Sequence, residues 1–271
     1  MRFTLAALAL LLLAGCFPRG SAKPPVVRTP QAPAPARHEA PPPSAPLEAP
    51  QVTVRTVSGI TFNGIAFDSR KHRLVVVDQA RGPGSEFADS AAAARPIGGI
   101  AAINAGFFTP DGRPLGGVVS SGKPAGSWNQ SSSLGSGAWF ETTAGNSALA
   151  RRGRIVRGKN LRELIQAGPL LIESGSGVGG LEATKVSARS LILWDGGSRW
   201  WIGRSSPCSL AALGQSLAIG PPAGWPVEHA LNLDGGRSSD LWISDRVAGG
   251  PVLIRPPWNR PVRNFLVLVA R

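Results

Sequence analysis

The chain contains few residues of the kinds that build disulfide frameworks and metal centres. Of its 271 residues, two are Cys and three are His. Two cysteines are too few for a disulfide-stapled fold or a Cys-rich zinc site, and three histidines leave little for a His-based metal centre. We therefore predict no metal site and no cofactor, and we expect the folded part to depend on its hydrophobic core.

Acidic residues are also scarce, with 16 Asp and Glu against 29 Lys and Arg and a formal net charge of +13. Such an excess raises the question of nucleic-acid binding. The sequence shows no recognition motif for nucleic acid, and its one tight basic group is Arg151, Arg152 and Arg154. We predict that nucleic acid is not the partner and that the charge favours anionic glycans and lipid headgroups.

The N-terminal apolar run, residues 5–14, is too short to cross a bilayer core of about 30 Å as a helix. Residues 1–16 instead match a signal peptide. Their last four residues, Leu13-Ala-Gly-Cys16, resemble a bacterial lipobox, which implies lipidation of Cys16 and a membrane anchor in the cell envelope. Phe17 in place of Asp favours the outer membrane over the inner one. An ordinary signal peptide with a chance cysteine is the alternative.

Residues 17–50 hold eleven prolines and almost no bulky apolar side chain. No core can form from this composition. Proline without a glycine repeat favours an extended polyproline-II spacer, which over this length reaches about 100 Å. We predict a disordered tether that leaves residues 51–271 as one folded domain with a net charge of +10.

Short alternating or β-branched runs dominate residues 51–271. Three segments have helical character, namely residues 85–94, 160–167 and 209–218, the last two with capping signals at Asn160 and Ser209. Strands and helices do not alternate regularly, which argues against a doubly wound sheet or a TIM barrel. We predict a single α+β domain, mainly antiparallel or mixed β-sheet with a few short helices. The predicted strands are 52–57, 60–67, 73–78, 100–103, 138–142, 191–194, 200–202, 230–233, 241–243 and 265–269.

A hairpin is predicted at residues 190–202, where Asp195-Gly-Gly-Ser joins two apolar runs. Asp195 is interpreted as a turn residue rather than a catalytic one. Four tryptophans have two interpretations: they belong to the core, or they stack on sugar rings. These are Trp200, Trp201, Trp225 and Trp258.

Two glycine-bearing polar segments are candidates for chemistry. The first reads Ala102-Ile-Asn-Ala-Gly106-Phe-Phe, and the second reads Ala230-Leu-Asn232-Leu-Asp234-Gly-Gly-Arg-Ser-Ser239. Glycine N–H groups, an Arg guanidinium and two hydroxyls are the hydrogen-bond donors that an anion site needs. A carboxylate there suggests proton transfer, nucleophilic attack or the binding of sugar hydroxyls. A hairpin turn with a solvated Arg is the competing interpretation.

Four segments, in this order, resemble the phosphodiester glycosidase family. They are Asn104-Ala-Gly-Phe-Phe108, Gln166-Ala-Gly168-Pro-Leu170, Ala188-Arg189-Ser190 and Asn232-Leu-Asp-Gly-Gly-Arg-Ser-Ser239. The resemblance covers residues 60–270. It implies an α+β fold rich in antiparallel sheet and hydrolysis of the bond between an anomeric carbon and a phosphodiester, which releases a free sugar and a phosphomonoester.

The resemblance also implies roles for individual residues. Asn104 would hold substrate hydroxyls or phosphate, Arg189 would clamp the phosphate, and Asp234 would lie at the catalytic centre. A strand-edge surface residue is the alternative for Arg189. The sequence departs from the family pattern at Ala105, at Ser190 and at Arg237, where many relatives have a small residue. The implied substrate-binding residues are Gly106, Gly168, Asn232, Gly235, Gly236, Arg237, Ser238 and Ser239.

A glycosidase normally uses two carboxyl groups. Glu173 is the candidate for the second, with a structural strand-end residue as its alternative. Because phosphate is already a good leaving group, Asp234 with cationic stabilisation could also suffice. The predicted function is hydrolysis of the bond between an anomeric sugar carbon and a phosphodiester, in a cell-envelope glycan or a related sugar-1-phosphodiester. The alternative is a non-catalytic envelope module that binds anionic glycan through the same pocket.

Overall fold

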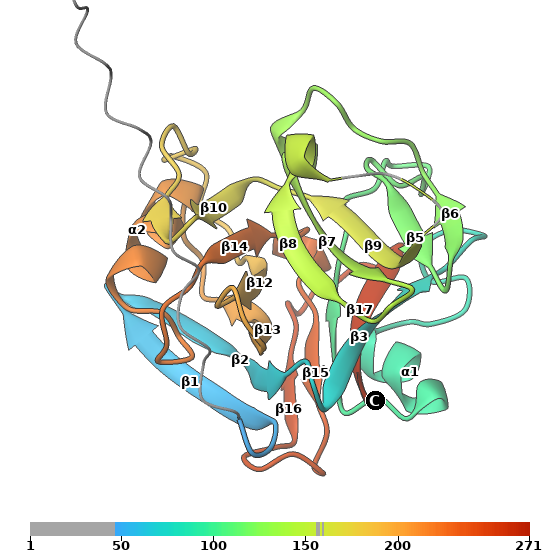
Figure 1. Ribbon diagram of the computed structural model, residues 1–271, viewed down its shortest axis with the longest axis horizontal. Coiled ribbons are helices and arrows are strands. Elements are labelled where there is room, and N and C mark those ends of the chain that lie inside the picture. Colours follow the sequence, from blue (N-terminus) through green and yellow to red (C-terminus); the bar gives the residue numbers. More distant parts are fainter. Residues whose placement is uncertain (1–46, 156–157, 159) are drawn as a thin grey trace, which may run out of the picture. The chain divides into compact units, whose positions relative to one another are not determined.

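Three β-sheets build the domain (Figure 1). In this computed structural model, residues 47–155, 158 and 160–271 are described. The predicted signal peptide, the lipidation site Cys16 and the tether up to residue 46 lie outside the described residues. Within them the first strand begins at Gln51, and none of the helices is long and apolar enough to cross a membrane. The predicted α+β class is confirmed: strands predominate, with two short α-helices among the described residues.

The largest sheet has seven strands in the order β1-β2-β13-β12-β14-β10-β11. All pairings between its strands are antiparallel. Its strands are β1 (Gln51–Val57), β2 (Ile60–Asp68), β10 (Leu170–Glu173), β11 (Ser176–Gly177), β12 (Ser190–Trp194), β13 (Arg199–Ser205) and β14 (His229–Asn232).

Two five-stranded sheets complete the domain, in the orders β16-β15-β4-β17-β3 and β6-β5-β9-β7-β8. Their named strands also pair antiparallel. The first contains β3 (His72–Asp78), β4 (Ala101–Asn104), β15 (Leu241–Ile243), β16 (Val252–Ile254) and β17 (Asn264–Ala270), and the second β5 (Val118–Ser120), β6 (Lys123–Ala125), β7 (Gly137–Thr142), β8 (Ser147–Arg151) and β9 (Leu161–Ala167).

The main core lies between the sheets and contains buried side chains from all three, such as Ile192, Ile103 and Ile165. The opposite face of the large sheet is covered by α2 (Leu210–Ile219), whose Leu213 and Leu217 join a second apolar cluster. The Ser209 cap is confirmed, since its side chain accepts a hydrogen bond from the Ala212 N–H. The other α-helix, α1 (Ser90–Ala94), is shorter than predicted and begins after its cap, Asp89. The 3-10 turns are Arg95–Ile97, Ser133–Gly135, Arg152–Arg154 and Gly236–Ser238.

The helix predicted at residues 160–167 is wrong: this segment is strand β9. Residues 163–167 are buried without interruption, so the segment has no solvent face for a helix to display. β9 pairs with β5 on one side and β7 on the other. Backbone hydrogen bonds from two neighbouring strands therefore outweigh the local capping signal at Asn160.

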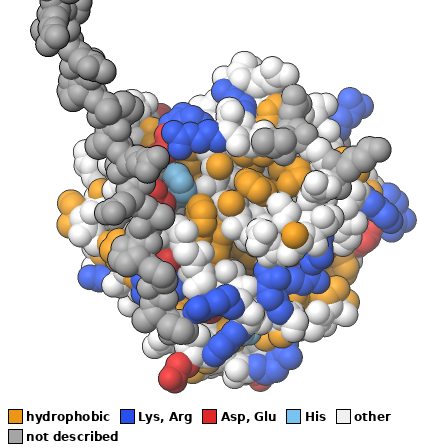
Figure 2. Space-filling view, viewed as in Figure 1, with side chains coloured by type: hydrophobic (Ala, Val, Ile, Leu, Met, Phe, Trp, Pro, Cys, Tyr) orange, Lys and Arg blue, Asp and Glu red, His pale blue; other side chains and the backbone are white. Residues whose placement is uncertain are grey.

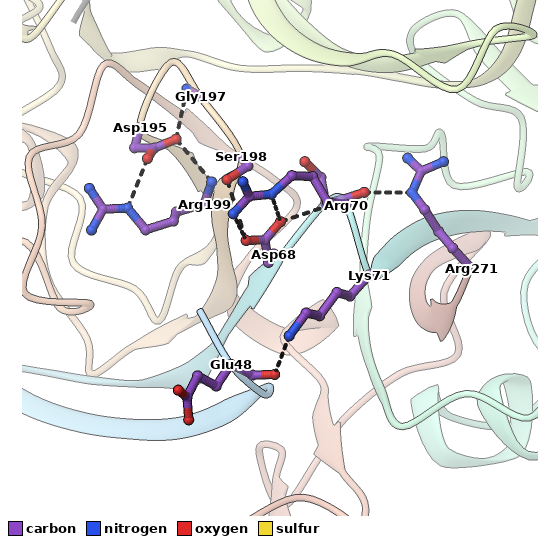
Figure 3. A network of polar contacts seen from close by, with 10 residues as sticks. Glu48, Asp68, Arg70, Lys71, Asp195, Gly197, Ser198, Arg199 and Arg271 are labelled. Carbon is purple, nitrogen blue, oxygen red and sulfur yellow. Dashed lines mark hydrogen bonds and ion pairs between the residues drawn. The ribbon is translucent and has the colours of Figure 1, made fainter. Parts of the chain in front are cut away.

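The predicted hairpin is confirmed as β12 and β13, and Figure 3 shows its turn. The Asp195 carboxylate accepts hydrogen bonds from the N–H groups of Gly197 (2.8 Å) and Arg199 (3.0 Å) and from Arg199 Nε (2.9 Å). The positive φ of the turn, 83°, lies at Gly196 rather than at Asp195. Asp195 therefore stabilises the turn through its side chain, as a turn residue should.

Of the four tryptophans with two interpretations, Trp200, Trp201 and Trp225 are buried and belong to the core. Trp258 differs, because 68% of its surface is exposed.

Candidate functional site

The candidate site lies where β14 ends and the chain turns at Gly235 and Gly236. Gly236 has a φ of 62°, which favours glycine, and its N–H donates to Ala188 O at 2.8 Å. A Cβ on Gly235 would lie 2.6 Å from the same carbonyl oxygen. The two glycines thus let the turn fit closely against the chain before β12. The sequence analysis assigned glycine N–H groups to an anion site. The Gly236 N–H instead donates to a carbonyl inside the protein.

Asp234 is held in this turn by its backbone. Its N–H donates to Ala105 O (2.9 Å), and its carbonyl accepts from Asn104 Nδ2 (2.6 Å). The carboxylate Oδ1 accepts from the Gly235 N–H at 2.9 Å, while Oδ2 is buried without a hydrogen-bond partner in the structure. Burial raises the pKa of the Asp234 carboxyl, and Ser238, Arg260 and the Gly235 N–H oppose that rise.

Asn104 is the last residue of β4; it is fully buried and contacts this turn. Besides its bond to Asp234, its Oδ1 accepts hydrogen bonds from Ser190 Oγ (2.6 Å) and the Asp240 N–H (3.1 Å). Ser239 Oγ lies 3.3 Å from Ser190 Oγ. Asn104 and Ser239 were predicted to meet substrate, yet the structure places both inside the protein. There they fix the turn that carries Asp234.

Arg189 approaches the same turn through its main chain, but its side chain points elsewhere. Its Nε donates to Cys208 O (3.2 Å) and its Nη2 donates to Lys185 O (2.6 Å). Burial lowers the pKa of the guanidinium, and no carboxylate forms an ion pair with it among the described residues. A buried cation bound only by neutral carbonyls is suited to an anionic ligand.

Asn232 and Gly168, both predicted to bind substrate, do meet. Asn232 Nδ2 donates to Gly168 O at 2.9 Å, and Asn232 Oδ1 is buried without a partner in the structure. A Cβ on Gly168 would lie 2.1 Å from Ser133 O, so this position requires glycine. The N–H of Gly106, in contrast, donates to Asn264 Oδ1 (2.7 Å), and a Cβ there would fit at 3.4 Å.

Two cationic side chains were missed by the sequence analysis, Arg260 beside the Asp234 turn and Arg204 in the hairpin. Arg260 Nε donates to Ser238 Oγ at 3.2 Å, and its guanidinium lies 4.8 Å from the centre of the Phe108 ring. Arg204 stands opposite Ser190 in the hairpin, with a buried Nε that has no partner in the structure. The hairpin register, extended by two residues, predicts that position of Arg204. Arg260 lies in none of the glycine-bearing segments.

Glu173, the predicted second carboxylate, is not brought to Asp234. It stands opposite His229 at the start of β14, whereas Asp234 follows the end of that strand. Five extended residues span about 17 Å. Arg151 Nε donates to Glu173 Oε1 at 2.9 Å, and this partner lowers the pKa of the Glu173 carboxyl. Glu173 is thus an ion-paired strand-end residue in this structure.

No group of three or more His, Cys, Asp or Glu side chains is arranged as a metal site within residues 47–155, 158 and 160–271. The site combines the buried carboxyl group of Asp234 with the guanidinium of Arg260, whose charge acts on it. Such a set can bind an anionic substrate and exchange a proton or an electron pair with it. The fold and this cluster together define a candidate hydrolase site in an antiparallel α+β domain.

The chain belongs to the phosphodiester glycosidase family, whose model matches residues 97–269. That range includes every candidate residue from Asn104 to Arg260. Membership supports hydrolase activity of the glycosidase type at the level of the family. No curated protein matches the sequence.

Solved structures with the same fold include the catalytic domain of zebrafish N-acetylglucosamine-1-phosphodiester alpha-N-acetylglucosaminidase, auto-inhibited by its pro-peptide. It is 17% identical with a TM-score of 0.56, and the match covers 82% of each chain. A hypothetical protein from Synechocystis is 20% identical with a TM-score of 0.55, over 83% of this chain and 62% of that one.

Proposed function

We propose that the protein hydrolyses the bond between an anomeric sugar carbon and a phosphodiester in an anionic glycan. The observation that supports this most directly is the Asp234 carboxyl group, fixed by Asn104 and Ala105 with one oxygen unpaired. Family membership supplies the reaction type.

In the proposed reaction, Asp234 acts as the base. It takes a proton from water while the water oxygen bonds to the anomeric carbon, and the carbon–oxygen bond to phosphate breaks. The electron pair stays on the phosphate oxygen, so the phosphomonoester leaves as an anion. A cation that stabilises this charge replaces a general acid. Arg260 is placed for this, because it contacts Ser238 in the same turn and its charge acts on Asp234.

The charge of the domain supports an anionic substrate. Residues 51–271 carry a net charge of +10. On the face shown in Figure 2, Lys and Arg side chains form several separate groups around an area of exposed hydrophobic atoms. Scattered cations of this kind attract a charged polymer over a broad area.

The experiment is to incubate the protein with an N-acetylglucosamine-1-phosphodiester and to quantify both free sugar and phosphomonoester. We expect equal amounts of the two products from the parent protein and none above background from Asp234→Asn. If neither protein cleaves any glycosyl phosphodiester, the proposed reaction is wrong. Binding of the glycan by both proteins without turnover would instead support the non-catalytic envelope module.

We also propose that Cys16 carries a lipid that anchors the protein in the cell envelope, facing the periplasm or the surface of the outer membrane. The lipobox-like sequence supports this proposal, and residues 17–50 would be the tether. Metabolic labelling with a fatty acid should label the parent protein and not Cys16→Ser. Equal labelling of the two would contradict the anchor.

A further inference from the structure

A cavity lies at the end of β15 that is remote from the Asp234 turn. β15 begins beside that turn, because the Asp240 N–H donates to Asn104 Oδ1 (3.1 Å). It ends before Ser244, whose N–H donates to Ile100 O (2.8 Å). From Asp240 to Ser244 the extended chain spans about 13 Å. The cavity has a volume of about 420 Å³, and its lining includes Arg95, Gly99, Trp242, Ser244, Asp245 and Arg246.

Trp242 provides the apolar wall of this cavity. Its neighbours on β15, Leu241 and Ile243, are fully buried in the main core. Trp242 lies on the opposite face of the strand, where it is partly buried against the apolar cluster that includes Ala94. On the same face, Leu253 of β16 stands opposite Trp242 and is 59% exposed. The indole ring is therefore fixed on one side by the protein and offers apolar surface to a ligand in the cavity.

Two arginines border the cavity without a carboxylate partner. Arg246 is held by backbone carbonyls, since its Nη2 donates to Gly99 O (2.7 Å) and to Gly98 O (3.3 Å). The guanidinium carbon of Arg95 lies 5.9 Å from the centre of the Trp242 ring. Neither guanidinium forms an ion pair with any residue that the structure describes. Both positive charges are therefore available to an anionic group.

The cavity is also lined by one carboxylate, that of Asp245. Its Oδ1 accepts a hydrogen bond from Ser244 Oγ at 2.9 Å, and the residue is exposed. A carboxylate repels a simple anion such as phosphate, but it accepts hydrogen bonds from hydroxyl groups. A ligand that matches the ring, the guanidinium groups and this carboxylate has an apolar face, a negative charge and hydroxyl groups. Those are the properties of an acidic sugar.

We propose that this cavity binds an acidic sugar of an anionic glycan, at a place separate from the Asp234 turn. The negative group of the sugar lies between Arg95 and Arg246, its hydroxyl groups donate to Asp245, and its apolar face packs on Trp242. Binding here needs no reaction at Asp234, so it is independent of the proposed hydrolysis.

The experiment follows the Trp242 ring by fluorine NMR of the whole protein labelled with fluorotryptophan. The Trp242 signal is assigned by its absence in Trp242→Phe. Glucose 6-phosphate, glucose and inorganic phosphate are titrated separately. We expect glucose 6-phosphate to shift this signal at a concentration about tenfold lower than either of the others. An equal response to glucose 6-phosphate and phosphate, or no response to any of the three, would overturn the sugar site.

Variants of the lining residues test how the ligand is held. Arg95→Gln and Arg246→Gln should each weaken the response to glucose 6-phosphate about tenfold. Because Arg95 is exposed, its replacement should leave the fold unchanged even if that of Arg246 does not. Arg81→Gln removes the same charge from an exposed position that does not line the cavity, and the response should stay the same. A similar loss in Arg81→Gln would mean that only the net charge matters.

The carboxylate gives a further test, because it acts in opposite directions on sugar and phosphate. Asp245→Ala removes the acceptor for the hydroxyl groups and also the repulsion of phosphate. The preference for glucose 6-phosphate over phosphate should therefore fall to less than about twofold. An unchanged preference would contradict the role of Asp245 and the sugar site with it. If the expected shifts are found while no diester is cleaved, the sugar site stands and the hydrolysis fails.

Discussion

The sequence Asp-Gly-Gly occurs twice in this domain, at Asp195 and at Asp234, and the two turns differ in what holds them. Both aspartates are buried, with 6% and 8% of their surface exposed. The Asp195 carboxylate is bound within its own hairpin by Gly197 and Arg199. The Asp234 turn is instead held through its backbone by Asn104 and Ala105, which are distant in the chain.

This difference determines what each carboxylate can do. A carboxylate whose oxygens close its own turn is committed to structure, and displacing its partners would open the hairpin. When the backbone is held from outside, a carboxylate oxygen can remain unpaired in a fixed position, as Asp234 Oδ2 does. A group held in this way is preorganised for a ligand.

The largest effect should come from the two Asp→Asn variants. Asp234→Asn removes the proposed base and should lower kcat about a thousand-fold with little change in the melting temperature. Asp195→Asn weakens the Arg199 ion pair and should lower stability by about 1–2 kcal/mol while kcat stays within about twofold. Steady-state kinetics and thermal unfolding of both variants test this, and a similar loss of kcat in both would remove the distinction between the turns.

Much of the fold followed from local sequence. All ten predicted strands are present, because apolar alternation and turn residues reflect the same burial that the sheets require. The segment at 160–167 failed because its partners β5 and β7 are separate in the chain, and β5 is too short to give a clear signal. The helix-capping propensity of Asn160 is a local property, whereas strand β9 forms because it pairs with strands from elsewhere in the chain.

The sequence predicted which residues belong to the candidate site better than it predicted how their side chains are oriented. The motifs named both Asn232 and Gly168, and the two residues are hydrogen-bonded in the structure. The motifs did not show that Asn104 points inward, since strand position alone does not say which buried partners a side chain finds. Arg260 was missed because its approach to Ser238 depends on how the loop before β17 returns across the turn.

Glu163 is another buried carboxyl group, with 1% of its surface exposed. Burial raises its pKa from 4.5 to about 7, against hydrogen bonds from the N–H groups of Val76 and Ser121 and the charge of Arg73. The folded state therefore holds its proton more tightly, so stability should fall by about 3 kcal/mol as the pH rises from 4.5 to 7 and then level off.

Urea unfolding between pH 4.5 and 7 measures this fall in stability. Glu163→Gln should lose most of the pH dependence, whereas Glu86→Gln, at an exposed position, should keep it. Activity should change only as far as folding does, because the hydrogen bonds to this carboxyl come from the N–H groups of Val76 and Ser121, outside the Asp234 turn. A parallel fall in both variants would show that another group controls the dependence.

Glycine-to-alanine changes test how tightly each turn is constrained. Gly235→Ala places a Cβ 2.6 Å from a backbone carbonyl and should cost about 2–3 kcal/mol, with a loss of activity as Asp234 moves. Gly196→Ala meets the cost of its φ of 83° and should lose about 1 kcal/mol with activity intact. If Gly196→Ala impaired kcat as much as Gly235→Ala does, the two turns would not be functionally distinct.

The smallest expected effect is a displacement of the pH profile. Burial raises the pKa of Asp234 and the charge of Arg260 opposes that rise, so Arg260→Gln should raise this pKa further. A base must be ionised to act, and the acid limb of kcat/KM should therefore move to higher pH. Arg199→Gln removes the cation of the other turn, which pairs with Asp195 instead, and the limb should stay in place. If Asp234 acted in its protonated form, the higher pKa would instead move the alkaline limb of Arg260→Gln to higher pH and leave the acid limb in place.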